Sequence, residues 1–163
     1  AHALLEARMP EQVGASVVHG DYRIGNFLSN PATGKINAVL DWELCTLGDP
    51  MADVGYLMND WNGPDDQSPT ASGTESSAVS CGGFPDRAIM LARYEALTGR
   101  STASVNYYRA FQYWRLAAIV EGVLARYLKG VMGDGGDTNR FKAQVEALAT
   151  AAVQLATSND LSG

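Results

Sequence analysis

The sequence has few of the features that mark several common protein classes. Its only two cysteines, Cys45 and Cys81, form no C-x-x-C motif, and we interpret them as free or buried thiols in a reducing cytoplasm. Lys and Arg total 12 against 18 Asp and Glu, which gives a formal charge of −6. No nucleic-acid partner is therefore expected. The densest apolar run, residues 116–120, is too short to cross a bilayer, and no signal-peptide pattern is visible, so no membrane partner is expected either.

What remains is an ordinary globular composition. The 163 residues are 46% hydrophobic and 18% charged, which suits one folded domain with its own core. Hydrophobic periodicity and turn residues predict an α+β fold that is mostly helical. Helices are expected at 1–8, 50–61, 85–97, 103–128 and 140–156, strands at 15–19, 26–29 and 36–41, and a flexible surface loop at 62–84. The helix at 103–128 is apolar on two faces, which predicts burial within a helical layer.

One stretch, VVHGDYRIGNFLSN at residues 17–30, places a carboxylate and a carboxamide at a fixed interval. Asp21 precedes Asn26 by five positions, and Asp41 ends the next predicted strand. Pairing of the two strands on either side of the turn at 30–35 would return Asp41 close to Asn26. A carboxylate that accepts a proton, with an amide and a second carboxylate that hold Mg²⁺, is the arrangement used in phosphoryl transfer.

The segments HGDYRIGNFL and VLDWELCTLGDPMADVGYL together resemble the aminoglycoside phosphotransferase and choline kinase superfamily. Within that superfamily they are most similar to the branch found fused to acyl-CoA dehydrogenases. The similarity is strong over 17–61 and looser beyond. It implies a protein-kinase-like C-terminal lobe, in which a small β-hairpin carries the catalytic loop and the metal-binding Asp, with ATP as co-substrate and Mg²⁺ as cofactor.

The resemblance also implies roles for individual residues. Asp21 would be the catalytic base, and Asn26 and Asp41 would bind Mg²⁺ with the nucleotide phosphates. His19 would brace the catalytic loop through hydrogen bonds. Asp53 would support that loop by accepting hydrogen bonds from its main chain.

Three further residues have more local interpretations. Arg23 is expected to face the substrate and to steady an anionic group. Glu43 lies two residues after Asp41, on the same side of a chain expected to be extended there, so it is a candidate metal residue that could reach a metal-bound water or the substrate. Asp49 is expected to support the next helix as its N-cap, with Pro50 at the first helical position.

The sequence shows neither the glycine-rich flap nor the strand Lys of a kinase N-terminal lobe. Lys35, in the predicted hairpin turn, is the only Lys before position 129. We therefore interpret 1–163 as a C-terminal lobe whose partner is a missing N-terminal lobe, and expect no phosphate transfer by this chain alone. An uncovered apolar face makes self-association a further hypothesis.

Two kinds of function remain open at this point. The first is phosphorylation of a small-molecule hydroxyl, in a hydroxyacyl thioester or in an aminoglycoside-like or choline-like acceptor. The acidic surface would steer a cationic acceptor, whereas the likeness to the dehydrogenase-fused branch favours the thioester. The alternative is a non-catalytic, kinase-like module that binds a ligand or partner. A metal-dependent hydrolase is a distant third, because it would need more metal ligands than this spacing offers.

Overall fold

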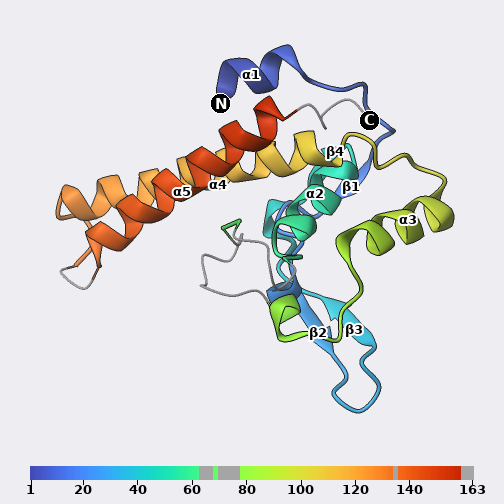
Figure 1. The fold of residues 1–163 in the computed structure, drawn as a ribbon. Helices are drawn as coiled ribbons and strands as arrows, with labels where there is room; N and C mark the ends of the chain where they lie inside the picture. Colours follow the sequence, from blue (N-terminus) through green and yellow to red (C-terminus); the bar gives the residue numbers. More distant parts are fainter. Residues whose placement is uncertain (63–67, 70–77, 134–135, 159–163) are drawn as a thin grey trace.

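The computed structural model describes residues 1–62, 68–69, 78–133 and 136–158 (Figure 1). Its helices are α1 (His2–Ala7), α2 (Met51–Asn59), α3 (Arg87–Thr98), α4 (Val105–Leu128) and α5 (Thr138–Thr157). Its strands are β1 (Ser16–Val18), β2 (Phe27–Ser29), β3 (Ile36–Val39) and β4 (Thr46–Gly48). Short 3-10 turns lie at Ile24–Asn26, Trp42–Leu44 and Ala78–Cys81. The predicted α+β, mostly helical fold is confirmed. Most of the loop expected at 62–84 lies outside the described residues.

The strands form two separate antiparallel pairs. β2 pairs with β3, with Phe27 opposite Val39, which is the predicted hairpin. β1 pairs with β4, with Val17 opposite Leu47, and this second pair was not predicted. β4 has only three residues and ends in a glycine, so its sequence carries little strand signal. The pairing brings the chain that precedes the loop at 20–25 against the chain that enters α2.

Several predicted boundaries in and after the hairpin are wrong by one to two residues. The third strand ends at Val39, and Asp41 adopts a left-handed conformation with φ 69° instead of an extended one. α2 begins at Met51, so Pro50 and not Asp49 occupies the N-cap position. α2 ends at Asn59, before Trp61. The Asp49 side chain nevertheless accepts a hydrogen bond from the Met51 N–H at 2.8 Å, as a capping group would.

The core around α2 depends on a close approach to α4. A Cβ atom at Gly55 would lie 2.6 Å from Cβ of Tyr108, so only glycine allows this spacing. Met51 and Tyr56 are almost completely buried there, with exposed fractions of 0% and 3%. A buried hydrogen bond of 3.0 Å from the Asn59 amide to the Arg109 carbonyl joins the same two helices.

α4 and α5 pack along each other and extend away from the rest of the molecule (Figure 1). Tyr113, Leu148 and Ala152 fill their contact. The prediction that α4 is buried on two faces holds only for its first half. Ile119 is 50% exposed and Leu128 62%, because α2 and α1 no longer cover the second half. None of the helices in the described ranges combines the length and apolar content needed to cross a bilayer.

Candidate active site

The catalytic-loop candidate, Gly20–Gly25, is fixed at its start by His19. The His19 ring is 1% exposed, and its Nδ1 accepts a hydrogen bond from the Asp21 N–H at 3.2 Å. Nε2 must then carry the ring proton, which it donates to the Leu40 carbonyl at 2.8 Å. One neutral imidazole therefore links the loop to the end of the hairpin. These are bracing hydrogen bonds of the kind that the family resemblance implies.

Asp53, in the first turn of α2, holds the same part of the loop from the other side. Its two carboxylate oxygens accept hydrogen bonds from the main-chain N–H groups of His19 at 2.6 Å and Gly20 at 2.9 Å. Gly20 has φ +84°, and a Cβ atom there would lie 2.7 Å from the Leu44 carbonyl oxygen. Only glycine can occupy this position without strain, so the G of the HGD motif has a local structural cause.

Asp21 lies at the centre of a polar cluster. Its carboxylate accepts a hydrogen bond from the Asn26 side-chain nitrogen at 2.9 Å and is 3.4 Å from Nε of Arg23. Burial by itself would raise the pKa of Asp21, but hydrogen bonding with Tyr56 and Asn26 and the charge of Arg23 outweigh it, so the net pKa is lowered. Asp21 is thus held ionised, and 22% of its side chain remains exposed.

Arg23 was expected to face an anionic substrate group, and the structure pairs it with Asp21 instead. The side chain is 32% exposed. Its guanidinium also lies beneath Gly25, where an added Cβ atom would come within 2.8 Å of Nη1. In this arrangement Arg23 stabilises the charged form of Asp21.

Two residues of this cluster were missed at the sequence level. Tyr56 of α2 is buried, and its hydroxyl lies close enough to the Asp21 carboxylate to lower the pKa of that acid. Burial and the nearby negative charge of Asp21 both raise the pKa of Tyr56. Arg115 of α4 lies with its guanidinium carbon 5.2 Å from the centre of the Tyr56 ring, and it donates a 2.6 Å hydrogen bond to the Gly20 carbonyl. Both residues look like core residues of helices in the sequence, and only the packing of α2 and α4 brings Tyr56 to Asp21 and Arg115 to Gly20.

Asn26 and Asp41, the predicted metal ligands, are brought together by the hairpin. The Leu40 N–H donates a 2.8 Å hydrogen bond to the Asn26 carbonyl, so Asp41 directly follows a residue bonded to Asn26. The Asn26 amide nitrogen donates to both the carbonyl and the carboxylate of Asp21. Its amide oxygen accepts no hydrogen bond from any described residue.

The conformation of Asp41 is unusual. It is the only non-glycine residue with positive φ in the described ranges, and its side chain is exposed. A left-handed conformation costs an L-residue roughly 1–2 kcal/mol, although Asp tolerates it better than most. Such an outlier at the end of a hairpin is a reason to suspect a functional orientation of the carboxylate.

Glu43 does not fit its predicted geometry. Trp42–Leu44 forms a 3-10 turn, so the argument from an extended chain is wrong: side chains two apart in such a turn do not share a side. Among the described residues, no group of three or more His, Cys, Asp or Glu side chains is placed to hold a metal ion. A metal site built on Asn26 and Asp41 would need non-protein ligands to complete it.

Asp49 is a structural carboxylate. It is 5% exposed, and besides the Met51 N–H it accepts hydrogen bonds from the Val13 N–H and the Tyr108 hydroxyl, both at 2.9 Å. It thus joins the N-terminal segment, the start of α2 and α4. Since these three donors occupy its oxygens in a buried position, Asp49 is not available to a ligand.

Comparison with known proteins agrees with this geometry. Residues 1–77 match the model of the phosphotransferase enzyme family. A crystal structure from Ralstonia eutropha JMP134, assigned as an aminoglycoside phosphotransferase, superposes with a TM-score of 0.76 and 32% sequence identity, over 94% of this chain. The resemblance to the phosphotransferase family is confirmed. The kinase-like fold class is confirmed with it.

Curated relatives of this chain are larger proteins. Acyl-CoA dehydrogenase family member 10 of Mus musculus is 37% identical over 127 residues, which are 77% of this chain and 12% of that protein. Acyl-CoA dehydrogenase family member 11 of Gallus gallus is 30% identical over 148 residues, which are 90% of this chain and 19% of that protein. The chain therefore spans less than a fifth of these two relatives, and 46% of the Ralstonia chain.

Proposed function

We propose that this chain is the catalytic lobe of an ATP- and Mg²⁺-dependent phosphotransferase that transfers the γ-phosphoryl group to a hydroxyl of a small molecule. The observation that carries the proposal is the arrangement of Asp21, Asn26 and Asp41. One ionised, partly exposed carboxylate lies on a glycine-containing loop and accepts a hydrogen bond from the Asn26 amide, while Asp41 follows Leu40, whose N–H is bonded to the Asn26 carbonyl. The match to the phosphotransferase family supports this reaction class over other uses of the same side chains.

In the proposed reaction, Asp21 orients the acceptor hydroxyl and takes its proton. The acceptor oxygen forms a bond to the γ-phosphorus as the bond from that phosphorus to the ADP oxygen breaks. The low pKa of Asp21 makes it a weak base, so proton transfer would follow bond formation and the main contribution would be positioning. Tyr56 and Arg23 keep the carboxylate charged and fixed in direction.

The residues present fit Mg²⁺. The amide oxygen of Asn26, which accepts no hydrogen bond within the described part of the chain, and the exposed carboxylate of Asp41 are hard oxygen donors. Mg²⁺ in phosphotransferases is commonly held by one or two such groups, with substrate phosphates and water as the other ligands. When bound, the ion would neutralise charge on the phosphates. Because the Asn26 amide nitrogen donates a hydrogen bond to the Asp21 carboxylate, an ion bound to Asn26 would also fix the position of Asp21.

We further propose that turnover needs an ATP-binding lobe docked on this one. The segment 17–47 exposes large apolar side chains, among them Leu28, Ile36 and Leu47 with exposed fractions of 52%, 54% and 78%. Apolar surface of this kind favours contact with a further segment or, without one, with a second copy of the chain. Size-exclusion chromatography with light scattering should show concentration-dependent association, and a monomer at high concentration would contradict it.

The acceptor we favour is a hydroxyacyl thioester. The support is indirect: the relatives named above are acyl-CoA dehydrogenase family members, and the matched region is a small part of each. An aminoglycoside-like or choline-like acceptor is the alternative, and the net charge of −6 would favour such a cation.

Thermal unfolding with nucleotide and Mg²⁺ tests the site in this chain. ATP with Mg²⁺ at about a hundred times its dissociation constant should stabilise the fold by about 2.7 kcal/mol, or roughly 5–10 °C. The shift should require Mg²⁺ and should be lost in Asp41→Asn. Glu146→Gln, which neutralises an exposed acid on α5, should keep it. An equal shift in Asp41→Asn and the control would refute the metal assignment, whereas no shift in any variant would favour a non-catalytic module.

An ADP-release assay tests the proposed chemistry at Asp21 separately from the proposed need for an ATP-binding lobe. The chain alone should show no turnover above background with candidate acceptors. Turnover that Asp21→Asn abolishes would confirm the chemistry and overturn the proposed need for a second lobe.

A further inference from the structure

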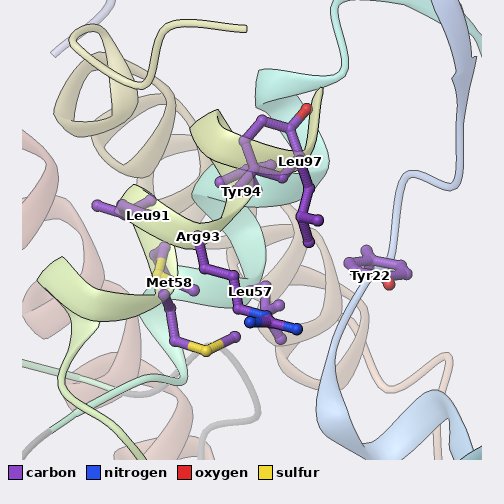
Figure 2. Close-up of a pocket in the computed structure, with 9 residues that line it drawn as sticks. Tyr22, Leu57, Met58, Leu91, Arg93, Tyr94 and Leu97 are labelled. Atoms are coloured by element: carbon purple, nitrogen blue, oxygen red, sulfur yellow. The ribbon is translucent and has the colours of Figure 1, made fainter. Parts of the chain in front are cut away.

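An apolar cavity of about 280 Å³ lies between α2 and α3 (Figure 2). Leu57 and two neighbours on α2 form one wall, and Leu91, Leu97 and further apolar side chains of α3 form the other. Tyr22 closes the side nearest the catalytic loop. Leu97 is 72% exposed at the edge, so the cavity opens to solvent.

The cavity is not part of the site around Asp21. Successive residues of a helix are about 100° apart, so Val54 and Leu57 share a face of α2 while Tyr56 lies on another. Val54 and Leu57 line the cavity, whereas Tyr56 contacts Asp21. Tyr22 alone connects the two, because it directly follows Asp21 in the loop and lines the cavity.

Arg93 is the one charged side chain that lines this cavity. In Figure 2 its guanidinium is directed into the gap between Leu57 and Tyr22. It is exposed, and it forms no ion pair or hydrogen bond with any residue that the structure describes. In a protein with a net charge of −6, an unpaired cation beside an apolar cavity is complementary to a ligand with an anionic end.

We propose that this cavity binds a medium-chain carboxylate, with the alkyl chain between α2 and α3 and the carboxylate on Arg93. An apolar cavity of about 150 Å³ accommodates benzene, so 280 Å³ suits a chain of roughly eight to ten carbons. This site goes beyond the proposed phosphotransfer and does not depend on it. Its occupant would contact Tyr22 and so would steady the loop that carries Asp21.

Calorimetric titration of the 163-residue chain with hexanoate, octanoate and decanoate tests the chain-binding part. Each buried methylene is expected to tighten binding about threefold to fourfold until the cavity is filled. Binding should saturate at one ligand per chain below the critical micelle concentration. Affinity that does not depend on chain length, or the absence of saturable octanoate binding, would overturn the proposal.

The Arg93→Met variant tests the anionic end, since Met keeps much of the length and apolar character of the side chain. Octanoate should bind it about threefold to tenfold more weakly, and octan-1-ol should bind it as it binds the unmodified chain. The matched control is Arg126→Met, which removes an exposed Arg at the far end of α4 and should leave octanoate binding unchanged. Equal octanoate affinity in the two variants would refute the role of Arg93.

Filling the cavity gives a third comparison. Leu57→Trp should weaken octanoate and octanol alike, provided that its far-ultraviolet circular dichroism matches that of the unmodified chain. Unchanged affinity in that folded variant would place the ligand elsewhere and contradict the proposal. If the variant does not fold, the chain-length series and the Arg93 pair still decide the question.

Discussion

Two pairs of aspartates in this lobe have opposite environments. Asp49 and Asp53 have their oxygens occupied by main-chain N–H groups, with the Tyr108 hydroxyl as a further donor to Asp49. Asp21 and Asp41 keep exposed surface and have few main-chain donors. Carboxylates bonded to main-chain N–H groups hold the fold together, whereas the Asp21 carboxylate is bonded only to side chains and the Asp41 side chain is exposed. The same residue type therefore has two roles within 33 positions, and the kind of hydrogen-bond donor distinguishes them.

Asp49→Ala should cause the largest loss of stability. It would leave the Val13 and Met51 N–H groups and the Tyr108 hydroxyl without their acceptor, and each unsatisfied buried group costs about 1–3 kcal/mol. We expect the free energy of unfolding in urea to fall by about 3 kcal/mol or more. Glu146→Ala on α5 is the control, and a similar small change in both variants would contradict the structural role.

Asp53→Ala should lower the free energy of unfolding by about 2 kcal/mol, less than Asp49→Ala does. Asp53 is only half-buried, so water can replace part of its role. The loss should be local. Hydrogen exchange should become faster at the amides of His19 and Gly20 well before it does in α4. Unchanged protection at these two amides would mean that Asp53 does not hold the loop.

Asp41→Gly should stabilise the fold, in contrast to the two preceding variants. Glycine adopts φ 69° without strain, so the free energy of unfolding should rise by about 1 kcal/mol. The same variant should lose the Mg²⁺-dependent response to nucleotide. A variant that is destabilised, or that keeps this response, would show that the conformation of Asp41 serves the fold and not a ligand.

Tyr56→Phe should have the smallest effect on stability and a specific effect on Asp21. Burial raises the pKa of Asp21 and the Tyr56 hydroxyl lowers it, so the pKa of Asp21 should rise when that hydroxyl is removed. In the unmodified chain the folded-state pKa of Asp21 is below the ordinary 3.8. The stability that Asp21 contributes is therefore present above pH 3.8 and is lost as the pH falls through the folded-state pKa. Carboxyl NMR titration measures the change, and Tyr107→Phe, which is not part of the cluster, should leave it unaltered.

The sequence predicted the β2–β3 hairpin better than it predicted the segments around it. Asp21, Asn26 and the hairpin follow from local features: a short apolar run, a Pro-Gly turn and a second run of matching length. β4 was missed because three residues carry too little strand signal, and the boundary at Asp41 was missed because left-handed Asp leaves no pattern.

Tyr56 and Arg115 illustrate a different limit. Each has ordinary helical spacing within an apolar stretch, and nothing local distinguishes it from a core residue. Tyr56 lies against Asp21, and Arg115 against Gly20 and the Tyr56 ring, only because α2 packs closely on α4 at Gly55, which is a tertiary property. The exposure of the second half of α4 is also a tertiary property, because it depends on which helices cover that part of α4.

Paramagnetic relaxation with Mn²⁺ and ADP tests the central claim most directly. In chain labelled with ¹³C and ¹⁵N, a Mn²⁺ ion in the position proposed for Mg²⁺ should broaden the Asn26 side-chain amide and the Asp41 carboxyl signal together, at the same metal concentration. Signals of Asp49, whose oxygens are occupied, should broaden less. Broadening of Asp41 without Asn26, or of neither, would contradict a shared metal site.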